Sequence, residues 1–170
     1  MSQRPIQARD AVAVAIRDAT HADIDALVPM VNAAYRLSEG HVFPTTDRVD
    51  RTDAMKQIDG IAVAETGGRL VGCIHATMDD DSAHFGMLAT NVNMQGRGIA
   101  SALIAHAENT ARASGCTVMR IETIREAGHV RFYERFGYCV TGETPGQTWN
   151  RGADWGAATP WHMVDMEKQL

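Results

Sequence analysis

The chain has 170 residues, the size of one ordinary domain, so we expect a single domain across residues 1–170. Hydrophobic residues make up 45% and charged residues 22%, which is typical of a globular protein with a core of its own. The formal net charge is −5, from 16 basic and 21 acidic residues. This acidic excess argues against a dedicated nucleic-acid binder and weakly favours a neutral or cationic small-molecule partner.

The apolar runs and the first residues predict a cytoplasmic protein with no membrane contact. The longest runs, such as Ala11–Ile16 and Leu70–Ala76, are much shorter than the roughly 20 residues of a membrane-spanning helix. Residues 1–5 contain no apolar segment followed by a cleavage site, so we expect no secretion signal. The polar residues 1–11 are expected to be loosely structured.

Neither the cysteines nor the densest acidic run has the spacing of a metal site. Residues 79–82 (Asp-Asp-Asp-Ser) read as a solvated turn, because the carboxylates are adjacent and no loop wraps around an ion. The cysteines are odd in number and lie in or beside strand-like stretches, which predicts buried, reduced thiols and no metal cofactor. They are Cys73, Cys116 and Cys139.

The first half of the chain predicts two helices among antiparallel strands. Thr20 and Asp23 resemble a capping box in which Thr20 accepts from the first-turn amides, and an apolar stripe continues that helix to about Leu37. The tight turn at Gly67-Gly68 joins two β-branched runs, and short turns force consecutive strands to pair antiparallel. The predicted order is strand 12–17, helix 20–37, loop 38–46, short polar helix 47–58, and strands 61–65, 70–78 and 83–92.

In the second half, helices alternate with strands. An apolar stripe from Gly98 to Ser114 predicts a helix, which Gly115 ends. The predicted elements after it are strand 117–124, helix 129–136, strand 138–142, a long loop at 143–160 and a last strand at 161–167. No repeat or linker divides the chain.

The most informative segment is Gln95-Gly96-Arg97-Gly98-Ile99-Ala100-Ser101, between a predicted strand and a predicted helix. A helix N-terminus offers unpaired amides and a partial positive charge, and glycines let the backbone approach an anion closely. Arg97 adds a charge and Ser101 a hydroxyl. These features predict a phosphate or pyrophosphate site, and the alternative is a simple glycine turn that opens a helix.

Two other phosphate-binding patterns fit this segment less well. A Walker loop needs Gly-Lys-Ser/Thr at the helix start, which is absent. Gly96-x-Gly98-x-x-Ser101, with Glu122 at the end of the next strand, nearly fits a dinucleotide-binding fingerprint, but the third glycine is missing. The segment also follows three hairpin-linked strands, and too few βα units come after it. An NAD-dependent enzyme is therefore the weaker interpretation.

Three segments together resemble the GNAT family of N-acetyltransferases. Gln95-x-x-Gly98-x-Ala100 resembles that family's (Arg/Gln)-x-x-Gly-x-(Gly/Ala) coenzyme A signature, and residues 86–90 (Gly-Met-Leu-Ala-Thr) are similar to its central strand. Residues 132–138 (Phe-Tyr-Glu-Arg-Phe-Gly-Tyr) are similar to its Tyr-(Glu/Lys)-x-x-Gly-Phe segment. The order of elements fits over nearly the whole chain from Val12. The chain departs from the family at Glu126, where an Asn is frequent, and at Asn93 and Met94, where a Pro is usual.

The resemblance implies an α/β, GNAT-like (acyl-CoA N-acyltransferase) fold. Its central sheet is mixed and mostly antiparallel, with one splayed strand pair and about four flanking helices. Acetyl-CoA would lie in the wedge where strands 83–92 and 117–124 separate. The backbone of residues 95–101 would bind the pyrophosphate, and free backbone groups near Leu88 and Thr90 would pair with the pantetheine and polarise the thioester. The implied cofactor-binding residues are Leu88, Ala89, Thr90, Gln95, Gly96, Arg97, Gly98, Ile99, Ala100 and Ser101.

The resemblance also makes Tyr133 the first candidate for the general acid that protonates the departing thiolate. From spacing alone, Tyr133 would be a core aromatic beside Phe132 and Phe136. The base that removes the amine proton is less specified. His84 and Glu122 are the candidates, with His75 behind them, and each has the alternative of a surface or hydrogen-bonded residue. By strand alternation, His84 shares a face with Gly86 and Leu88, and Glu122 shares one with Arg120 and Ile124.

The expected activity is direct transfer of the acetyl group from acetyl-CoA to a primary amine, on a small molecule or a peptide. The rival is a non-catalytic acyl-CoA sensor of the same fold. Tryptophans and charges before the last strand could wall an amine pocket, cover the sheet edge or meet a partner in a homodimer. These residues are Trp149, Arg151, Asp154, Trp155 and Trp161.

Overall fold

The computed structural model describes residues 10–149 and 156–170. Its centre is one seven-stranded sheet with the order β1-β2-β3-β4-β5-β7-β6. All neighbouring strands pair antiparallel except β4 and β5, which are parallel. This is the mixed, mostly antiparallel sheet that the sequence predicts. The strands are β1 (Ala15–Asp18), β2 (Ile61–Thr66), β3 (Arg69–Asp79), β4 (Ser82–Thr90), β5 (Val118–Ile124), β6 (Cys139–Pro145) and β7 (His162–Gln169).

Five α-helices are joined to these strands among the described residues. They are α1 (Ile24–Glu39), α2 (Arg51–Lys56), α3 (Ile99–Ala113), α4 (Val130–Glu134) and α5 (Gly146–Trp149). Helix α5 lies in the segment expected to be a loop, and β6 runs three residues further than expected, to Pro145. The first strand begins at Ala15, later than expected. The expectation for residues 1–11 falls mostly outside the described residues.

The predicted capping box of Thr20 and Asp23 is present at the start of the first helical turn, where the Asp23 carboxylate accepts from the Thr20 backbone amide (2.7 Å) and hydroxyl (3.0 Å). One predicted detail is wrong. Cys139 is exposed, because β6 is an edge strand of the sheet, whereas Cys73 and Cys116 are buried as expected.

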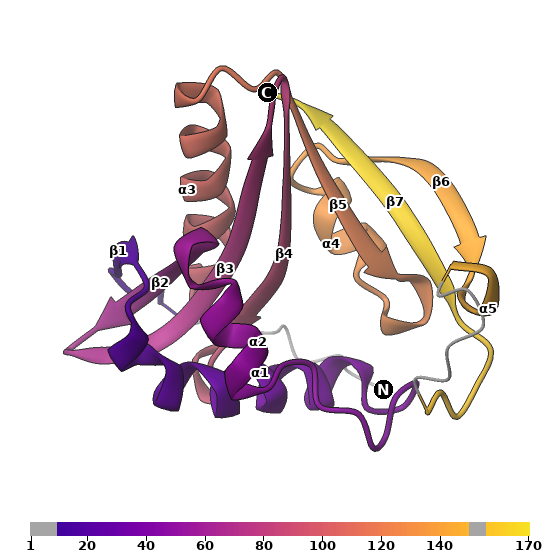
Figure 1. Ribbon diagram of the computed structural model, residues 1–170, viewed down its shortest axis with the longest axis horizontal. Coiled ribbons are helices and arrows are strands. Elements are labelled where there is room, and N and C mark those ends of the chain that lie inside the picture. Colours follow the sequence, from indigo (N-terminus) through magenta and orange to yellow (C-terminus); the bar gives the residue numbers. More distant parts are fainter. Residues whose placement is uncertain (1–9, 150–155) are drawn as a thin grey trace, which may run out of the picture.

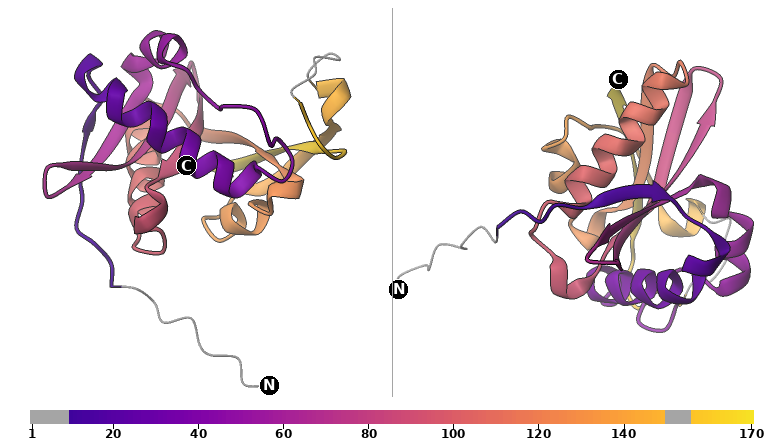
Figure 2. Two further views of the ribbon diagram at one scale, coloured as in Figure 1. Left: turned by 90° about the horizontal axis from the view of Figure 1, so that it is seen from below. Right: turned by 90° about the vertical axis from the view of Figure 1, so that its left-hand side faces the viewer.

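The helices lie on both faces of the sheet, as the two views of Figure 2 show. Helices α1 and α2 pack on one face in a cluster that includes Leu27, Val31 and Val63. Helix α3 packs on the other face with Leu103, Phe85 and Met119, and α4 adds partly buried aromatic rings to that cluster. Along β2 the residues alternate between the two clusters, as a strand buried on both faces requires.

The feature that shapes the molecule is the separation of β4 from β5. The two strands pair only between Ser82–His84 and Val118–Arg120. Beyond these three residue pairs they diverge, so that β1–β4 and β5–β7–β6 form two half-sheets joined at one end (Figure 1). The open end of this wedge faces α1. The predicted splayed pair is therefore present at the predicted strands.

Candidate acetyl-transfer site

A cavity of about 380 Å³, here called the central cavity, occupies the opening between β4 and β5. Its walls come from β4, β5, α1, α4 and the start of α3. Of the thirteen predicted catalytic and cofactor-binding residues, nine line it: His84, Leu88, Ala89, Thr90, Gln95, Gly96, Ala100, Glu122 and Tyr133. The wedge thus brings together residues from the predicted cofactor segments and all three catalytic candidates.

A bulge in β4 changes which face its side chains point to. Met87 has φ 45°, in the left-handed region, and the pairing with β3 is irregular opposite it. Before the bulge Phe85 packs in the α3 cluster, whereas after it Met87 and Ala89 pack in the α1 cluster. Leu88 therefore packs on the α3 side, opposite to His84, and the predicted shared face for these two residues is wrong.

The glycine segment before α3 forms a bend with unused amides. Gly96 and Gly98 have φ of 74° and 82°, which a side chain would strain, and Gly98 is the N-cap of α3. Among the described residues, none of the backbone amides of residues 95–101 donates a hydrogen bond to another protein group. A second hollow of about 420 Å³, the bend hollow, lies against this segment and shares five lining residues with the central cavity: Thr90, Gln95, Gly96, Ala100 and Phe132.

The charged residue at the bend hollow is not the one that the sequence suggested. Arg135 lines the hollow from just beyond α4, with its guanidinium 5.5 Å from the centroid of the Phe132 ring. Arg97 lines neither space: its carbonyl accepts from the Val12 amide (3.1 Å), and its buried Nε has no hydrogen-bond partner in the described part of the chain. The predicted role of Arg97 as the charge beside the anion site therefore finds no support in the lining of either space.

Tyr133 reaches the central cavity from α4. Its ring contacts Phe85, Phe132 and Tyr138, with centroid distances of 6.1, 5.1 and 6.2 Å. The residue is thus both packed against the core and part of the cavity wall. Burial raises the pKa of the Tyr133 hydroxyl above its ordinary value, and the nearby Tyr35 and Glu39 raise it further. The phenol is therefore protonated throughout the neutral range.

The two proton-acceptor candidates differ in their surroundings. His84 is half-buried, and burial lowers the pKa of its imidazole although Glu122 opposes this. Glu122 lines the cavity but is exposed. His75 is not among the residues that line the cavity. The pKa of His75 is lowered by burial and by His84.

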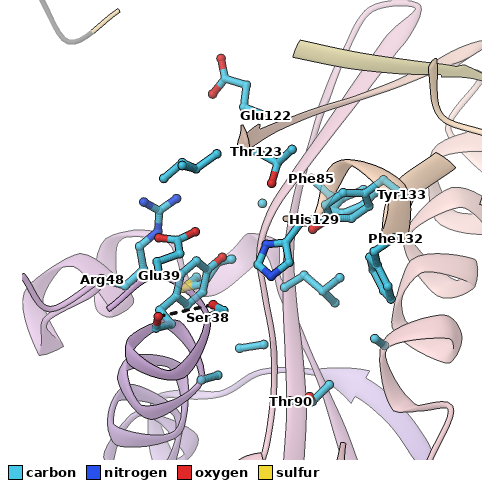
Figure 3. A pocket seen from close by; sticks show the side chains of 18 of the residues that line it. Ser38, Glu39, Arg48, Phe85, Thr90, Glu122, Thr123, His129, Phe132 and Tyr133 are labelled. Atoms are coloured by element: carbon cyan, nitrogen blue, oxygen red, sulfur yellow. Dashed lines mark hydrogen bonds between the residues drawn. The ribbon is translucent and has the colours of Figure 1, made fainter. Parts of the chain in front are cut away.

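The opposite wall of the cavity contains charged residues that sequence reasoning missed. Glu39 and Tyr35 from α1, and Arg48 from the segment before α2, line the central cavity, as does His129 at the start of α4. Figure 3 shows Glu39 and Arg48 on one side, Tyr133 and Phe132 on the other, and His129 between them. Burial lowers the pKa of His129, so its imidazole is neutral at neutral pH.

These missed residues also border a further space. A third cavity of about 290 Å³, the outer groove, lies against the end of α1 and the segment that follows it. It shares only Tyr35, Glu39 and Arg48 with the central cavity. Arg48 lies 4.9 Å from the centroid of the Tyr35 ring, and Arg36 and Asp47 form an ion pair (2.6 Å) on the groove side. These three shared residues mark the junction of the two spaces.

The segment after α1 is fastened across the open end of the wedge. Trp161 is buried against Phe43, with ring centroids 5.3 Å apart.

Glu126 accepts from the backbone amide and Nδ1 of His162 (both 2.9 Å), so its carboxylate is engaged within the protein. Of the other residues before the last strand, Arg151, Asp154 and Trp155 lie outside the described residues, as does the side chain of Trp149.

Residues 10–149 and 156–170 contain neither a metal-ligand cluster nor a membrane-spanning helix. Within these ranges no three His, Cys, Asp or Glu side chains gather as metal ligands do. In the same part of the chain, no helix is long and apolar enough to cross a bilayer.

Comparisons with known proteins agree with this geometry. The acetyltransferase (GNAT) family matches residues 26–138. The uncharacterized protein YdhI of Bacillus subtilis (strain 168) is 25% identical over 83 residues, which cover 48% of this chain and 51% of that protein. The match thus spans about half the length of that curated relative.

Two solved structures are similar over most of the chain. The ribosomal-protein-alanine N-acetyltransferase of Brucella melitensis superposes with a TM-score of 0.71 at 22% identity, covering 92% of this chain and 99% of that one. The PaiA N-acetyltransferase of Thermoplasma acidophilum, solved with coenzyme A, gives a TM-score of 0.75 at 15% identity, with 94% and 100% covered. At these identities the likeness establishes the fold. The family match spans well over half of the sequence, and the chain belongs to the GNAT family of acetyltransferases.

Proposed function

We propose that this protein transfers the acetyl group of acetyl-CoA to a primary amine by direct attack within a ternary complex. The observation that carries the proposal is that the bend hollow adjoins the central cavity, with five lining residues in common, beside two strands that have separated. One end offers unused amides and the other holds Tyr133. A thioester with a long carrier fits this arrangement, because its phosphates can meet the amides while its acyl group lies near Tyr133.

The bend supplies an anion site for the pyrophosphate. The free amides of residues 95–101 converge at the N-terminus of the 15-residue helix α3, where the helix dipole is positive. Arg135 adds an exposed positive charge at the bend hollow. The backbone of Gly96 and Gly98 permits close approach, because neither residue carries a Cβ.

Strand β4 supplies the contacts for the pantetheine arm. Beyond His84 its edge has no pairing with β5, while its other edge is paired with β3 as far as Thr90. The amides and carbonyls of this open edge can pair with the amides of the pantetheine, as an added strand would. An amide near Leu88 would then polarise the thioester carbonyl as an oxyanion donor.

The chemistry needs a nitrogen lone pair, a polarised carbonyl and a proton for the departing sulfur. The neutral amine forms a bond from nitrogen to the acetyl carbon, and the bond from carbon to sulfur breaks with its electron pair on sulfur. Tyr133 donates its proton to this thiolate, and the proton that the new amide nitrogen loses restores the phenol. No covalent intermediate on the protein is required.

Thiol release tests the activity itself. We expect acetyl-CoA to release thiol in the presence of at least one member of a panel made of alanine, spermidine, phenethylamine and a short peptide with a free N-terminus. The acceptor that gives the highest turnover would identify the class of amine. Tight binding of acetyl-CoA with no thiol release across the panel would instead favour a non-catalytic acyl-CoA sensor.

Replacement of Gly98 tests the anion site. Gly98→Phe should weaken acetyl-CoA binding at least tenfold in calorimetry, because the side chain would occupy the approach to the bend amides. Gly115→Phe is the matched control: Gly115 also has a positive φ (90°), at the far end of α3, with open space around it. Both changes strain the backbone, so unchanged affinity in Gly98→Phe, or an equal loss in both, would count against the bend as the pyrophosphate site.

A further inference from the structure

Glu39 is a mostly buried residue whose carboxylate forms no hydrogen bond or ion pair within the described chain. It is the last residue of α1 and is 8% exposed. Its backbone carbonyl accepts from the amides of Val42 and Phe43, but among the described residues its carboxylate takes part in no hydrogen bond and no ion pair. Glu39 is one of the three residues at the junction of the central cavity and the outer groove.

The second buried glutamate of the protein shows what a structural role looks like. Glu108 is 5% exposed and accepts from the Tyr138 hydroxyl (2.9 Å) and from Lys168 Nζ (2.8 Å), with Arg112 at 3.5 Å. Burial of a carboxylate is costly unless it is paired in this way. Glu39 is not paired in this way, and its carboxylate keeps access to the two spaces that it lines, which points to a cationic partner that enters there.

The charges around Glu39 leave room for such a partner. Burial raises the pKa of the Glu39 carboxyl, while Arg48 and His41 lower it. From α4 it faces the Tyr133 hydroxyl and the neutral imidazole of His129, and on its own helix Tyr35. On the groove side, Arg36 and Asp47 are already paired with each other. Glu39 lines the same cavity as Tyr133. No cation forms an ion pair with Glu39 in the described structure.

We propose that Glu39 binds the ammonium group of the acceptor, which enters through the outer groove, and takes its proton before the attack. This assignment rests on the proposed acetyl transfer. The acceptor nitrogen loses two protons in all. The first passes to the Glu39 carboxylate and then to solvent, and the second replaces the proton that Tyr133 gives to the thiolate. Glu39 and Tyr133 thus act on opposite sides of the reacting carbon, which matches their positions on α1 and α4 (Figure 3).

The first test compares two nucleophiles. Glu39→Gln should lower kcat/KM about 100-fold or more for the best amine of the panel, the range typical of a lost general base. Hydroxylamine is mostly unprotonated at neutral pH and needs no such base. With hydroxylamine, Glu39→Gln should therefore lower kcat/KM less than tenfold, after the uncatalysed reaction has been subtracted. Glu134→Gln, which changes an exposed glutamate on α4, is the matched control and should keep the wild-type rates with both nucleophiles.

The second test is the pH dependence. Because burial raises the pKa of Glu39, the acidic limb of kcat/KM should lie above the ordinary carboxyl range and should disappear in Glu39→Gln. Arg48→Gln removes a charge that lowers this pKa, so its limb should move to higher pH. Without any acceptor, the glutamate δ-carbon resonances of ¹³C-labelled protein should include one with a raised pKa, absent in Glu39→Gln.

The stability of Glu39→Gln separates the proposed role from a structural one. A carboxyl whose pKa is raised by folding stabilises the protein fully only below its unfolded pKa, and this contribution is lost as pH rises through the folded value. At neutral pH the Gln variant should therefore unfold at the same or a higher temperature. An equal loss of rate with amine and hydroxylamine, an acidic limb that persists, or a marked drop in unfolding temperature would overturn the assignment. Absence of thiol release in the wild type would instead defeat the proposed function, and the carbon titration would still report on Glu39.

Discussion

Tyr133 combines two properties that a proton donor for a thiolate needs. Its ring is fixed by three aromatic neighbours, and its hydroxyl lies in the wall of the central cavity. Burial raises its pKa, so the proton remains on the phenol until it is transferred. A packed aromatic and a proton donor are therefore compatible roles for the same side chain.

Tyr133→Phe should lower kcat about 100-fold and leave acetyl-CoA affinity within a factor of about three, since the variant keeps the ring and loses only the acid. Because the pKa of Tyr133 is raised, wild-type activity should persist well into the alkaline range. Thiol release against pH and calorimetry measure both effects. Tyr138→Phe is the matched control, because Tyr138 donates to Glu108 away from the cavity and should affect stability alone. Full turnover by Tyr133→Phe at every pH would exclude the acid role.

At the level of single residues, the sequence pointed to more of the central cavity's lining on β4, β5 and α4 than on α1. Tyr133, His84 and Glu122 lie on motifs or strands whose faces follow from local patterns. Glu39 has a local signal that is easy to pass over: it continues the apolar stripe of α1 one turn after Tyr35. A glutamate at that position signals a buried charge. Arg48 has no such signal, because the segment before α2 has no periodicity.

At the level of elements, alternation and turn chemistry predicted most strands and helices, and failed at the bulge of β4. Met87 has a positive φ although it is not a glycine, so nothing in the sequence marks the bulge. Simple alternation therefore predicted that Leu88 lies on the same face as His84. The three-residue pairing between β4 and β5 depends on contacts far apart in sequence, and only the family resemblance indicated the splay. Helix α5 is four residues long, too short for a periodic pattern.

The connection of α3 to the second half-sheet provides a stability test. Lys168 on β7 and Tyr138 before β6 both reach Glu108 on α3. Lys168→Met should lower the free energy of unfolding by about 2 kcal/mol, less than for a fully buried pair, because Lys168 is partly exposed and Tyr138 and Arg112 remain. Urea denaturation measures the change, and turnover per folded molecule should be unchanged. The double variant Glu108→Gln/Lys168→Met should recover part of the loss, and strictly additive losses would contradict the coupling.

At the level of the whole molecule, the site exists because the two half-sheets are connected at both ends of the wedge and separated between these ends. Three residue pairs join β4 and β5 at one end. At the other end a small cluster connects the segment after α1 with β5 and the start of β7, through Phe43, Ile124 and Trp161. The amide of Ala158 also donates to the carbonyl of Val42 (2.7 Å). The wedge is therefore bridged at both ends, and an extended ligand can fill what lies between.

Acetyl-CoA should stabilise the folded protein and should protect the backbone amides of β4 and of the bend that have no partner in the protein. At a concentration 100 times its Kd, acetyl-CoA should raise the free energy of unfolding by about 2.7 kcal/mol, because it binds only the folded state. In hydrogen exchange, protection should rise within residues 88–90 and 95–101, where amides that are not already bonded to β3 gain acceptors, and should change little at the edge strand β6 beyond the global increase. S-acetylpantetheine lacks the pyrophosphate and should protect residues 88–90 but not the bend. Equal protection of the bend by both thioesters would place the pyrophosphate elsewhere, and no protection at residues 88–90 would remove the pantetheine from β4.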